Sequence, residues 1–200
     1  PLGIIPRGTA NAFSVALGIP TGVKAACTNL LLGNLRRVDV AVCNDRPMIL
    51  LAGLGFEAGM VDKASRELKN ILGPMAYIFS GARQLVDQQP FQATMQIDGN
   101  EYQLDTSAIT VANAAPATSV MAQGFGEVIP DDGLLEVIVA TPKDRIGGFS
   151  VLSSLAWSAI KSSNANHSNI ACFRTKQIQI KLNDVQKLVI DGEVLDAQTV

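Results

Sequence analysis

The residues Pro6-Arg7-Gly8-Thr9-Ala10-Asn11 stand between an apolar run and an apolar-periodic segment that starts at Phe13. This pattern is typical of a strand that passes through a short loop into a helix. Glycine and a hydroxyl residue in such a loop leave backbone N–H groups free to bind a phosphate. The same residues also fit an ordinary connection from strand to helix, in which Thr9 or Asn11 caps the helix.

A second candidate is the acidic turn Asp131-Asp132-Gly133, which precedes an apolar strand-like run from Leu134. Successive carbonyl groups in such a turn can bind a hard cation together with one carboxylate, because Mg²⁺ and Ca²⁺ prefer oxygen ligands. The alternative is a solvated β-turn, since aspartate and glycine favour turns without any ligand.

The third candidate is Asp191-Gly192-Glu193, which follows the apolar run Leu188-Val189-Ile190. A carboxylate at the end of a strand can act as the general base that deprotonates an alcohol. A hairpin turn explains the same residues, and Asp98-Gly99-Asn100-Glu101 repeats the pattern elsewhere in the chain.

Three other features of the sequence are weaker candidates for a functional site. His167 is the only histidine and stands in a polar loop without an expected partner, so no Ser/His/Asp triad is predicted. Gly53-Leu54-Gly55 lacks the third glycine of a dinucleotide loop, and we interpret it as a corner where two backbones approach closely. The apolar residues Met121, Phe125 and Val128 stand in a long polar loop, where they either line an acyl groove or cap a core.

Alternating strands separated by turns must position these candidates. The pattern predicts an antiparallel β-sandwich with attached helices, mainly β, over residues 36–200, preceded by part of an α/β lobe over residues 1–35. Expected helices cover residues 11–17, 21–33 and 146–161, with two helices or one kinked helix between 60 and 87. Expected strands cover residues 38–43, 48–52, 91–97, 102–112, 134–140, 171–182 and 187–190.

Composition restricts the class of protein. The chain has 200 residues, of which 48% are hydrophobic, and a net charge of −2, which provides no basic field for nucleic acid. No apolar run approaches the roughly 20 residues of a membrane span. Three widely spaced cysteines indicate reduced thiols in a cytoplasmic protein. The chain starts at Pro1 on a strand-like segment, so we expect that an upstream half precedes it.

Together the motifs resemble the bacterial diacylglycerol kinase family, which includes the sphingosine kinases and the YegS-type lipid kinases. The resemblance covers nearly the whole chain and rests on motifs in the same order. These are Pro6-Arg7-Gly8-Thr9-Ala10-Asn11, Gly53-Leu54-Gly55-Phe56-Glu57-Ala58, Gly73-Pro74-Met75-Ala76-Tyr77, Val111-Ala112-Asn113, Asp132-Gly133-Leu134-Leu135-Glu136-Val137 and Asp191-Gly192-Glu193.

The resemblance implies an ATP- and Mg²⁺-dependent lipid kinase of two lobes. The remnant of the α/β nucleotide-binding lobe would contact ATP, and the sandwich, of the NAD kinase and diacylglycerol kinase C-terminal type, would carry the metal and the base. By position, Thr9 would touch the nucleotide, with Gly8 and Asn11 shaping the loop. Asp132 and the carbonyls of Ile129 and Leu134 would hold a structural Mg²⁺. Glu193 would accept the proton of the lipid hydroxyl, and Asp191 would support it.

Two departures from the family affect these expectations. Ala12 stands where the family loop commonly has aspartate, and the glycine-rich aspartate motif of the nucleotide lobe is absent from these residues. We therefore expect the 200 residues alone to be inactive. A kinase of a soluble substrate such as NAD and a non-catalytic lipid-binding sandwich remain alternatives. The expected partners are a lipid substrate at the membrane surface, contacted peripherally, and a second copy paired through exposed sheet edges.

Overall fold

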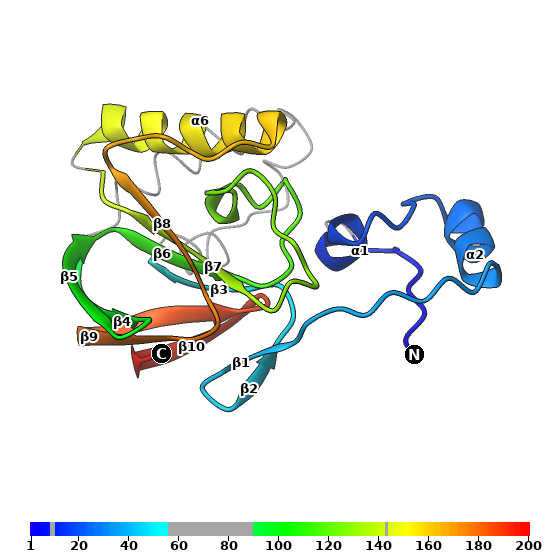
Figure 1. Ribbon diagram of the computed structural model, residues 1–200, viewed down its shortest axis with the longest axis horizontal. Coiled ribbons are helices and arrows are strands. Elements are labelled where there is room, and N and C mark those ends of the chain that lie inside the picture. The colour runs from blue at the N-terminus through cyan, green and yellow to red at the C-terminus, as the bar shows by residue number, and fades with distance from the viewer. Residues whose placement is uncertain (9–10, 56–89, 143) are drawn as a thin grey trace.

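A curled antiparallel sheet forms most of the computed structural model, with a long helix on one face (Figure 1). The structure describes residues 1–8, 11–55, 90–142 and 144–200. The helical segment expected between residues 60 and 87 lies outside these residues, as do Thr9 and Ala10. The mainly β, antiparallel fold class that the sequence predicts is confirmed.

The strands pair in the order β5-β4-β9-β3-β6-β7-β8, and β10 pairs with β9. A separate two-stranded hairpin joins β1 and β2. The bounds are β1 (Ala41–Cys43), β2 (Arg46–Met48), β3 (Leu51–Gly55), β4 (Phe91–Ile97), β5 (Asn100–Thr106), β6 (Ala108–Ala112), β7 (Leu135–Ala140), β8 (Ile170–Thr175), β9 (Ile178–Ile190) and β10 (Glu193–Thr199).

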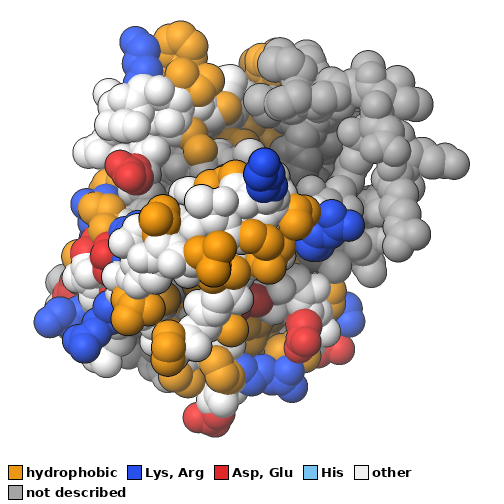
Figure 2. Space-filling view, turned by 90° about the vertical axis from the view of Figure 1, so that its right-hand side faces the viewer, with side chains coloured by type: hydrophobic (Ala, Val, Ile, Leu, Met, Phe, Trp, Pro, Cys, Tyr) orange, Lys and Arg blue, Asp and Glu red, His pale blue; other side chains and the backbone are white. Residues whose placement is uncertain are grey.

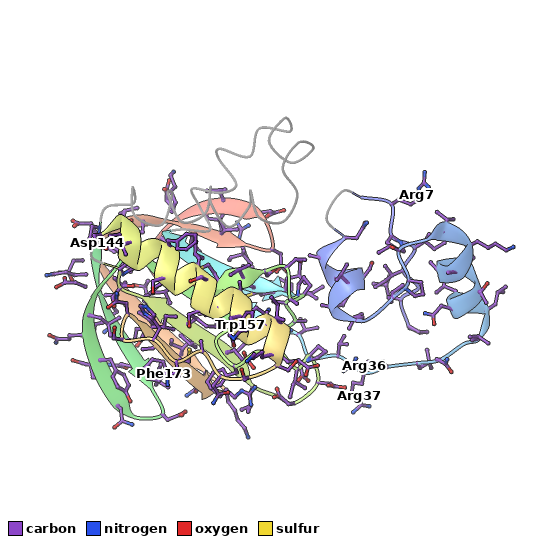
Figure 3. The ribbon with its side chains drawn as sticks, turned by 90° about the horizontal axis from the view of Figure 1, so that it is seen from above. Arg7, Arg36, Arg37, Asp144, Trp157 and Phe173 are labelled. Atoms are coloured by element: carbon purple, nitrogen blue, oxygen red, sulfur yellow. The ribbon has the colours of Figure 1, made fainter. Side chains whose placement is uncertain are left out.

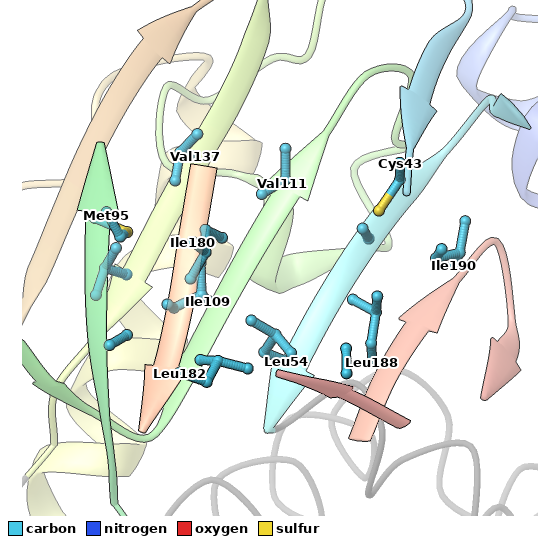
Figure 4. Packing of buried hydrophobic residues seen from close by; sticks show 14 of the residues in the cluster. Cys43, Leu54, Met95, Ile109, Val111, Val137, Ile180, Leu182, Leu188 and Ile190 are labelled. Atoms are coloured by element: carbon cyan, nitrogen blue, oxygen red, sulfur yellow. The ribbon is translucent and has the colours of Figure 1, made fainter. Parts of the chain in front are cut away.

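The long strand β9 connects the two layers of the sandwich. Its first residues, 178–182, pair with β4, and its last three, 188–190, pair with β3. The core between the layers therefore draws alternate residues from nearly every strand (Figure 4). It includes Leu54, Met95, Ile109, Val111, Val137, Ile180, Leu182, Leu188 and Ile190.

Helix α6 (Arg145–Lys161) covers the other face of the sheet. It begins at Asp144, whose Oδ1 accepts a hydrogen bond from the Gly147 N–H at 2.6 Å. Its inner residues form a second core with Ile138 of β7 and Met121 of the short 3₁₀ helix η1 (Val120–Ala122). Because Met121 and Val128 are also buried, these loop residues cap the core.

Several predicted strand boundaries are wrong, and three of them are explained by hydrogen bonds to residues distant in sequence. The expected strand 102–112 breaks at Ser107, where the Thr106 hydroxyl donates to the Ala140 carbonyl at 2.8 Å. The expected strand 171–182 breaks after Thr175, whose hydroxyl hydrogen-bonds Asp98. The break expected between the strands 171–182 and 187–190 lies inside β9, where Asn183 donates to Gln92 of β4 at 2.6 Å.

The close approach expected at the glycine-rich corner is confirmed at Gly55. This residue has a φ of +74°, and a Cβ there would lie 2.3 Å from the carbonyl oxygen of Ser107. A side chain at this position would therefore push β3 away from β6.

The first 40 residues form two helices, α1 (Ala12–Ala16) and α2 (Val23–Leu31), set apart from the sheet (Figure 1). Residues 2–5 form no strand, since a strand needs hydrogen-bonded neighbours and no described segment supplies them. Apolar side chains gather at the surface on this side (Figure 2), among them Leu2, Leu31, Leu32 and Leu35. The boundary predicted near Leu35 stays a prediction.

Candidate functional site

The turn between β9 and β10 is built around Asp191. Its carboxylate accepts three backbone hydrogen bonds, from the N–H groups of Ile49, Leu50 and Leu51, at 2.7, 2.8 and 3.0 Å. Its own N–H donates to the Leu51 carbonyl at 3.0 Å. Asp191 has a φ of +50° and Gly192 one of +96°, which suits a tight two-residue turn. Asp191 is therefore an anchor that fixes this turn to the start of β3.

The same contacts explain the wrong boundary of an expected strand. The sequence predicts a turn at residues 44–47 and one return strand at residues 48–52. In the structure the turn is Asn44-Asp45, β2 ends at Met48, and β3 starts only at Leu51. The N–H groups of Ile49 and Leu50 bind the Asp191 carboxylate, so they are unavailable to a sheet partner.

Glu193 is the first residue of β10 and stands two residues after the anchored aspartate. Its side chain is 79% exposed, and Arg46 Nη1 lies 3.6 Å from one carboxylate oxygen. The ion pair is loose and solvated, so it contributes little stability and leaves the carboxylate accessible. The turn held by Asp191 thus fixes where β10 starts, and the Glu193 carboxylate is largely exposed to solvent.

The acidic turn is held by Asp39, a residue that the sequence analysis did not single out. The Asp39 N–H donates to the Pro130 carbonyl at 2.8 Å, and Asp39 Oδ2 accepts the Gly133 N–H at 2.7 Å. Within the turn, Asp132 Oδ1 accepts the Leu134 N–H at 3.0 Å. The shape of the turn therefore depends on a segment more than 90 residues earlier in the chain.

Asn113 connects the acidic turn to the turn of Asp191. Its side-chain amide donates to the Asp39 carbonyl at 2.9 Å and to the Ile49 carbonyl at 2.8 Å. Its backbone N–H donates to the Leu50 carbonyl at 2.8 Å. Asn113 is 3% exposed, so these bonds are shielded from water. One hydrogen-bond network thus joins Asp132, Asp39, Asn113, the 49–51 segment and Asp191.

The two acids of the acidic turn have different environments. Arg36, which lies where the N-terminal segment joins the sheet (Figure 3), forms a bidentate pair with Asp131 at 3.0 and 3.2 Å. This hydrogen-bonded guanidinium lowers the pKa of Asp131 below its usual value. Because Asp131 is engaged by Arg36, Asp132 is the acid available to a cation.

The donor set around Asp132 fits a hard cation. Asp132 has one oxygen, Oδ2, that makes no hydrogen bond among the described residues, and Ile129 and Leu134 supply carbonyl oxygens nearby in sequence. The Pro130 carbonyl is taken by Asp39. Among the described residues, no group of three His, Cys, Asp or Glu side chains gathers for a metal, so a cation here would depend on carbonyl ligands.

The loop predicted for nucleotide contact is closed by a reciprocal pair. The Gly8 N–H donates to Asn11 Oδ1, and Asn11 Nδ2 donates to the Gly8 carbonyl, both at 2.7 Å. Asn11 has a φ of +48° and precedes α1, but its side chain caps no helix N–H. Asn11 is thus the N-cap residue of α1, as the alternative expects, and its carbonyl accepts the Val15 N–H at 3.0 Å, while its side chain binds Gly8. Thr9 lies outside the described residues.

His167 does have partners, contrary to the expectation from its polar loop. Its Nε2 lies 2.5 Å from the Ser150 hydroxyl, and its Nδ1 accepts the Asn169 N–H at 3.1 Å. Since Nδ1 accepts, Nε2 carries the proton when the ring is neutral and donates to Ser150. His167 therefore cannot accept a proton from Ser150 in this arrangement, and the pair ties α6 to the following loop.

Glu136 is a buried acid beside the acidic turn that sequence reasoning missed. Its side chain is 4% exposed, and Oε1 accepts hydrogen bonds from Arg174 at 2.7 and 3.2 Å. Its other oxygen, Oε2, is buried without a partner among the described residues. Burial raises the pKa of Glu136, and Arg174 opposes this. The guanidinium also lies over the Phe125 ring, 4.5 Å from its centroid.

Replacing Arg174 by methionine should destabilise the fold by about 2 kcal/mol, because the buried Glu136 carboxylate loses its cation. The estimate is below that for a fully buried pair, since Arg174 is 36% exposed. Urea unfolding of Arg174→Met and of the double variant Glu136→Gln/Arg174→Met measures this. The double variant should recover most of the loss. Equal losses in both variants would show that the pair is not the cause.

Two families match parts of this chain. Residues 51–200 match the family described as the YegS C-terminal NAD kinase beta sandwich-like domain. Residues 1–43 match the diacylglycerol kinase catalytic domain. The two matches follow each other along the chain. The loop motif at residues 6–11 lies in the first match, and the motifs at residues 111–113, 132–137 and 191–193 lie in the second.

Individual relatives are similar over almost the whole chain. An uncharacterized protein from Synechocystis sp. is 51% identical over 195 residues, which cover 98% of this chain and 45% of that protein. A diacylglycerol kinase from Staphylococcus aureus is 30% identical over 199 residues, or 96% of this chain and 59% of that enzyme. The chain therefore spans about half to three fifths of the length of these relatives.

A solved structure shares the fold. A diacylglycerol kinase from Bacillus anthracis superposes with a TM-score of 0.68 at 19% identity, covering 98% of this chain and 60% of that one. At this identity the match supports the architecture of strands and helices described above.

Proposed function

Because the chain belongs to the YegS-like diacylglycerol kinase family, we propose that it is the C-terminal part of an ATP- and Mg²⁺-dependent lipid kinase. The substrate would be diacylglycerol or a related lipid, phosphorylated on a hydroxyl. The enzyme would be cytoplasmic and would bind this lipid peripherally, at the membrane surface. The observation that supports this most is the network that holds the turn of Asp132 and the turn of Asp191 and Glu193 together. No described helix is long and apolar enough to cross a membrane.

The proposed reaction needs one base and one electrophile. Glu193 accepts the proton of the lipid hydroxyl as the alcohol oxygen attacks the γ-phosphorus of ATP. The bond from that phosphorus to the β–γ bridging oxygen breaks, and ADP leaves. Phosphoryl transfer depends mainly on positioning and charge neutralisation, so the rigid anchoring of Glu193 by Asp191 suits this role.

The nucleotide and the metal have separate sites in this proposal. Gly8, Thr9 and Asn11 form the loop that contacts ATP. Asp132 and the carbonyls of Ile129 and Leu134 would hold Mg²⁺, whose positive charge would stabilise the acidic turn. Hydrogen bonds of Asp39 and Asn113 connect this turn to the segment that binds the Asp191 carboxylate.

The test is a phosphorylation assay of the full-length protein encoded by the gene, with labelled ATP and Mg²⁺. The panel contains diacylglycerol, related lipids with a free hydroxyl, and NAD. We expect a phosphorylated lipid product. Phosphorylation of NAD alone would replace the lipid substrate by a soluble one, and no product with any acceptor would favour a non-catalytic sandwich.

Mg²⁺ should stabilise the fold through Asp132. Adding MgCl₂ in large excess should raise the midpoint of thermal unfolding, with a gain of about 2.7 kcal/mol when its concentration is about 100 times the Kd. Asp132→Asn should lose most of this gain because the amide has no charge and one acceptor oxygen. Asp131→Asn is the matched control and should keep it, since Asp131 is paired with Arg36. An equal loss in both variants would reject Asp132 as the specific ligand.

A further inference from the structure

The outer face of α6 carries large apolar side chains at the molecular surface. Ile146 is 81% exposed, Phe149 43%, Trp157 57% and Ile160 73%. These positions are separated by three, eight and three residues, so they lie along one face of the helix. In Figure 3, α6 lies in front of the sheet, so this face points away from it. We call these four residues the α6 stripe.

The opposite face of α6 is apolar as well. Val151, Leu152 and Leu155 are buried in the core against β6 and β7. A helix with apolar residues on both faces is usually covered on both, whereas a surface helix normally has a polar outer face. Scattered apolar side chains at a surface are ordinary, but four in a single stripe mark an interaction surface.

Charge on α6 favours an anionic partner. The helix has no acidic residue from position 145 to position 161, and the acid before it, Asp144, caps the helix N-terminus. At the other end Lys161 Nζ lies 4.9 Å from the centroid of the Trp157 ring. Tryptophan and lysine both combine an apolar body with a polar tip, which suits the boundary between lipid headgroups and acyl chains.

We propose that the α6 stripe docks on the surface of an anionic lipid bilayer. The helix would lie parallel to the membrane, with Ile146 and Ile160 inserted and Lys161 at the headgroups. This inference rests on the proposed function, because a kinase of diacylglycerol must reach a substrate that stays in the bilayer.

A second copy of the chain is a weaker occupant. A helix of 17 residues is about 25 Å long and about 10 Å wide, so it offers on the order of 250 Å². Stable protein interfaces bury about 800 Å² on each partner. The stripe alone is therefore too small for a stable dimer, whereas a bilayer needs only a row of side chains that can insert.

Trp157 provides the readout, because it is the only tryptophan of this chain. Its fluorescence is recorded with vesicles of phosphatidylcholine and phosphatidylglycerol, with and without brominated acyl chains. We expect a blue shift with anionic vesicles and quenching by the brominated ones. Unchanged emission with all vesicles would overturn the proposal.

The variant test replaces Ile146 and Ile160 by glutamate. We expect Ile146→Glu/Ile160→Glu to bind vesicles roughly tenfold more weakly or worse, since two charges must enter the headgroup layer. Val185→Glu is the matched control: Val185 is 60% exposed on β9, and this variant should bind normally. An equal loss of vesicle binding in both variants would overturn the proposal that the α6 stripe docks on the bilayer. So would a loss of binding that occurs only in Leu31→Glu of α2. So would a dimer in light scattering that only Ile160→Glu dissociates.

Kinase assays of the full-length protein separate this inference from the proposed function. On dioctanoylglycerol in solution the Ile146→Glu/Ile160→Glu variant should keep wild-type activity, and on long-chain diacylglycerol in vesicles it should lose activity. Wild-type protein that binds vesicles but phosphorylates no lipid would reject the function and leave the docking intact. Activity on both substrates without vesicle binding would reject the docking and leave the function intact.

Discussion

If Glu193 is the proposed base, replacing it by glutamine should reduce the lipid phosphorylation of the full-length protein by about 10²- to 10⁴-fold, the usual contribution of a general base. Glutamine keeps the size of the side chain and loses its ability to accept a proton. The fold should be unaffected, because Glu193 is 79% exposed and its contact with Arg46 is long, at 3.6 Å. The measurement is kcat with saturating ATP and lipid.

The chain contains a matched control for this experiment. Glu101 also follows an Asp-Gly turn, where Asp98 and Gly99 have φ values of +49° and +80°. Its carboxylate accepts weak hydrogen bonds from Gln96 and Gln103, both at 3.4 Å. Glu101→Gln should leave kcat unchanged. Unchanged turnover in Glu193→Gln would reject Glu193 as the base.

Replacing Asp191 by asparagine should lower the free energy of unfolding by about 3 kcal/mol. The carboxylate accepts three backbone N–H groups, whereas the amide has one acceptor oxygen and an NH₂ group that faces donors. Backbone strain is not the cause, because asparagine tolerates the positive φ of this position. Urea unfolding, followed by circular dichroism, measures the change.

Asp196→Asn is the control within the same hairpin. Asp196 pairs with Lys187 at 2.7 Å, but both side chains are more than half exposed, so this change should cost only a few tenths of a kcal/mol. Similar losses in the two variants would mean that the three backbone hydrogen bonds of Asp191 are not specifically stabilising.

Asp191→Asn should also affect activity beyond its effect on stability. Releasing residues 49–51 frees the turn that positions Glu193, so kcat should fall. The KM for ATP should stay nearly constant, because the loop proposed to contact ATP is Gly8 to Asn11. A fall in kcat with an unchanged KM for ATP distinguishes a positioning role of Asp191 from general unfolding of the protein.

Much of the fold could be predicted from the sequence, because it depends on local patterns. The alternation in β4, where Phe91, Ala93, Met95 and Ile97 are all buried, is visible without coordinates. Helix α6 is predicted to within one residue of its start from the helical recurrence of its apolar residues alone. Strand ends were predicted less well, because side chains such as that of Thr106 end them through partners distant in sequence.

The sequence by itself determined the turns that carry Asp132, Asp191 and Glu193, because glycine after an acid specifies a turn locally. Only the tertiary structure decided what these turns bind. Asp191 and Asp98 stand in the same local pattern, yet Asp191 anchors β3 through N–H groups 140 to 142 residues away, and Asp98 bonds the Thr175 hydroxyl. The contacts of Asp39, of Asn113 and of Glu136 with Arg174 were missed for the same reason. Their hydrogen bonds depend on which strands become neighbours and in which register, and no short stretch of sequence contains that information.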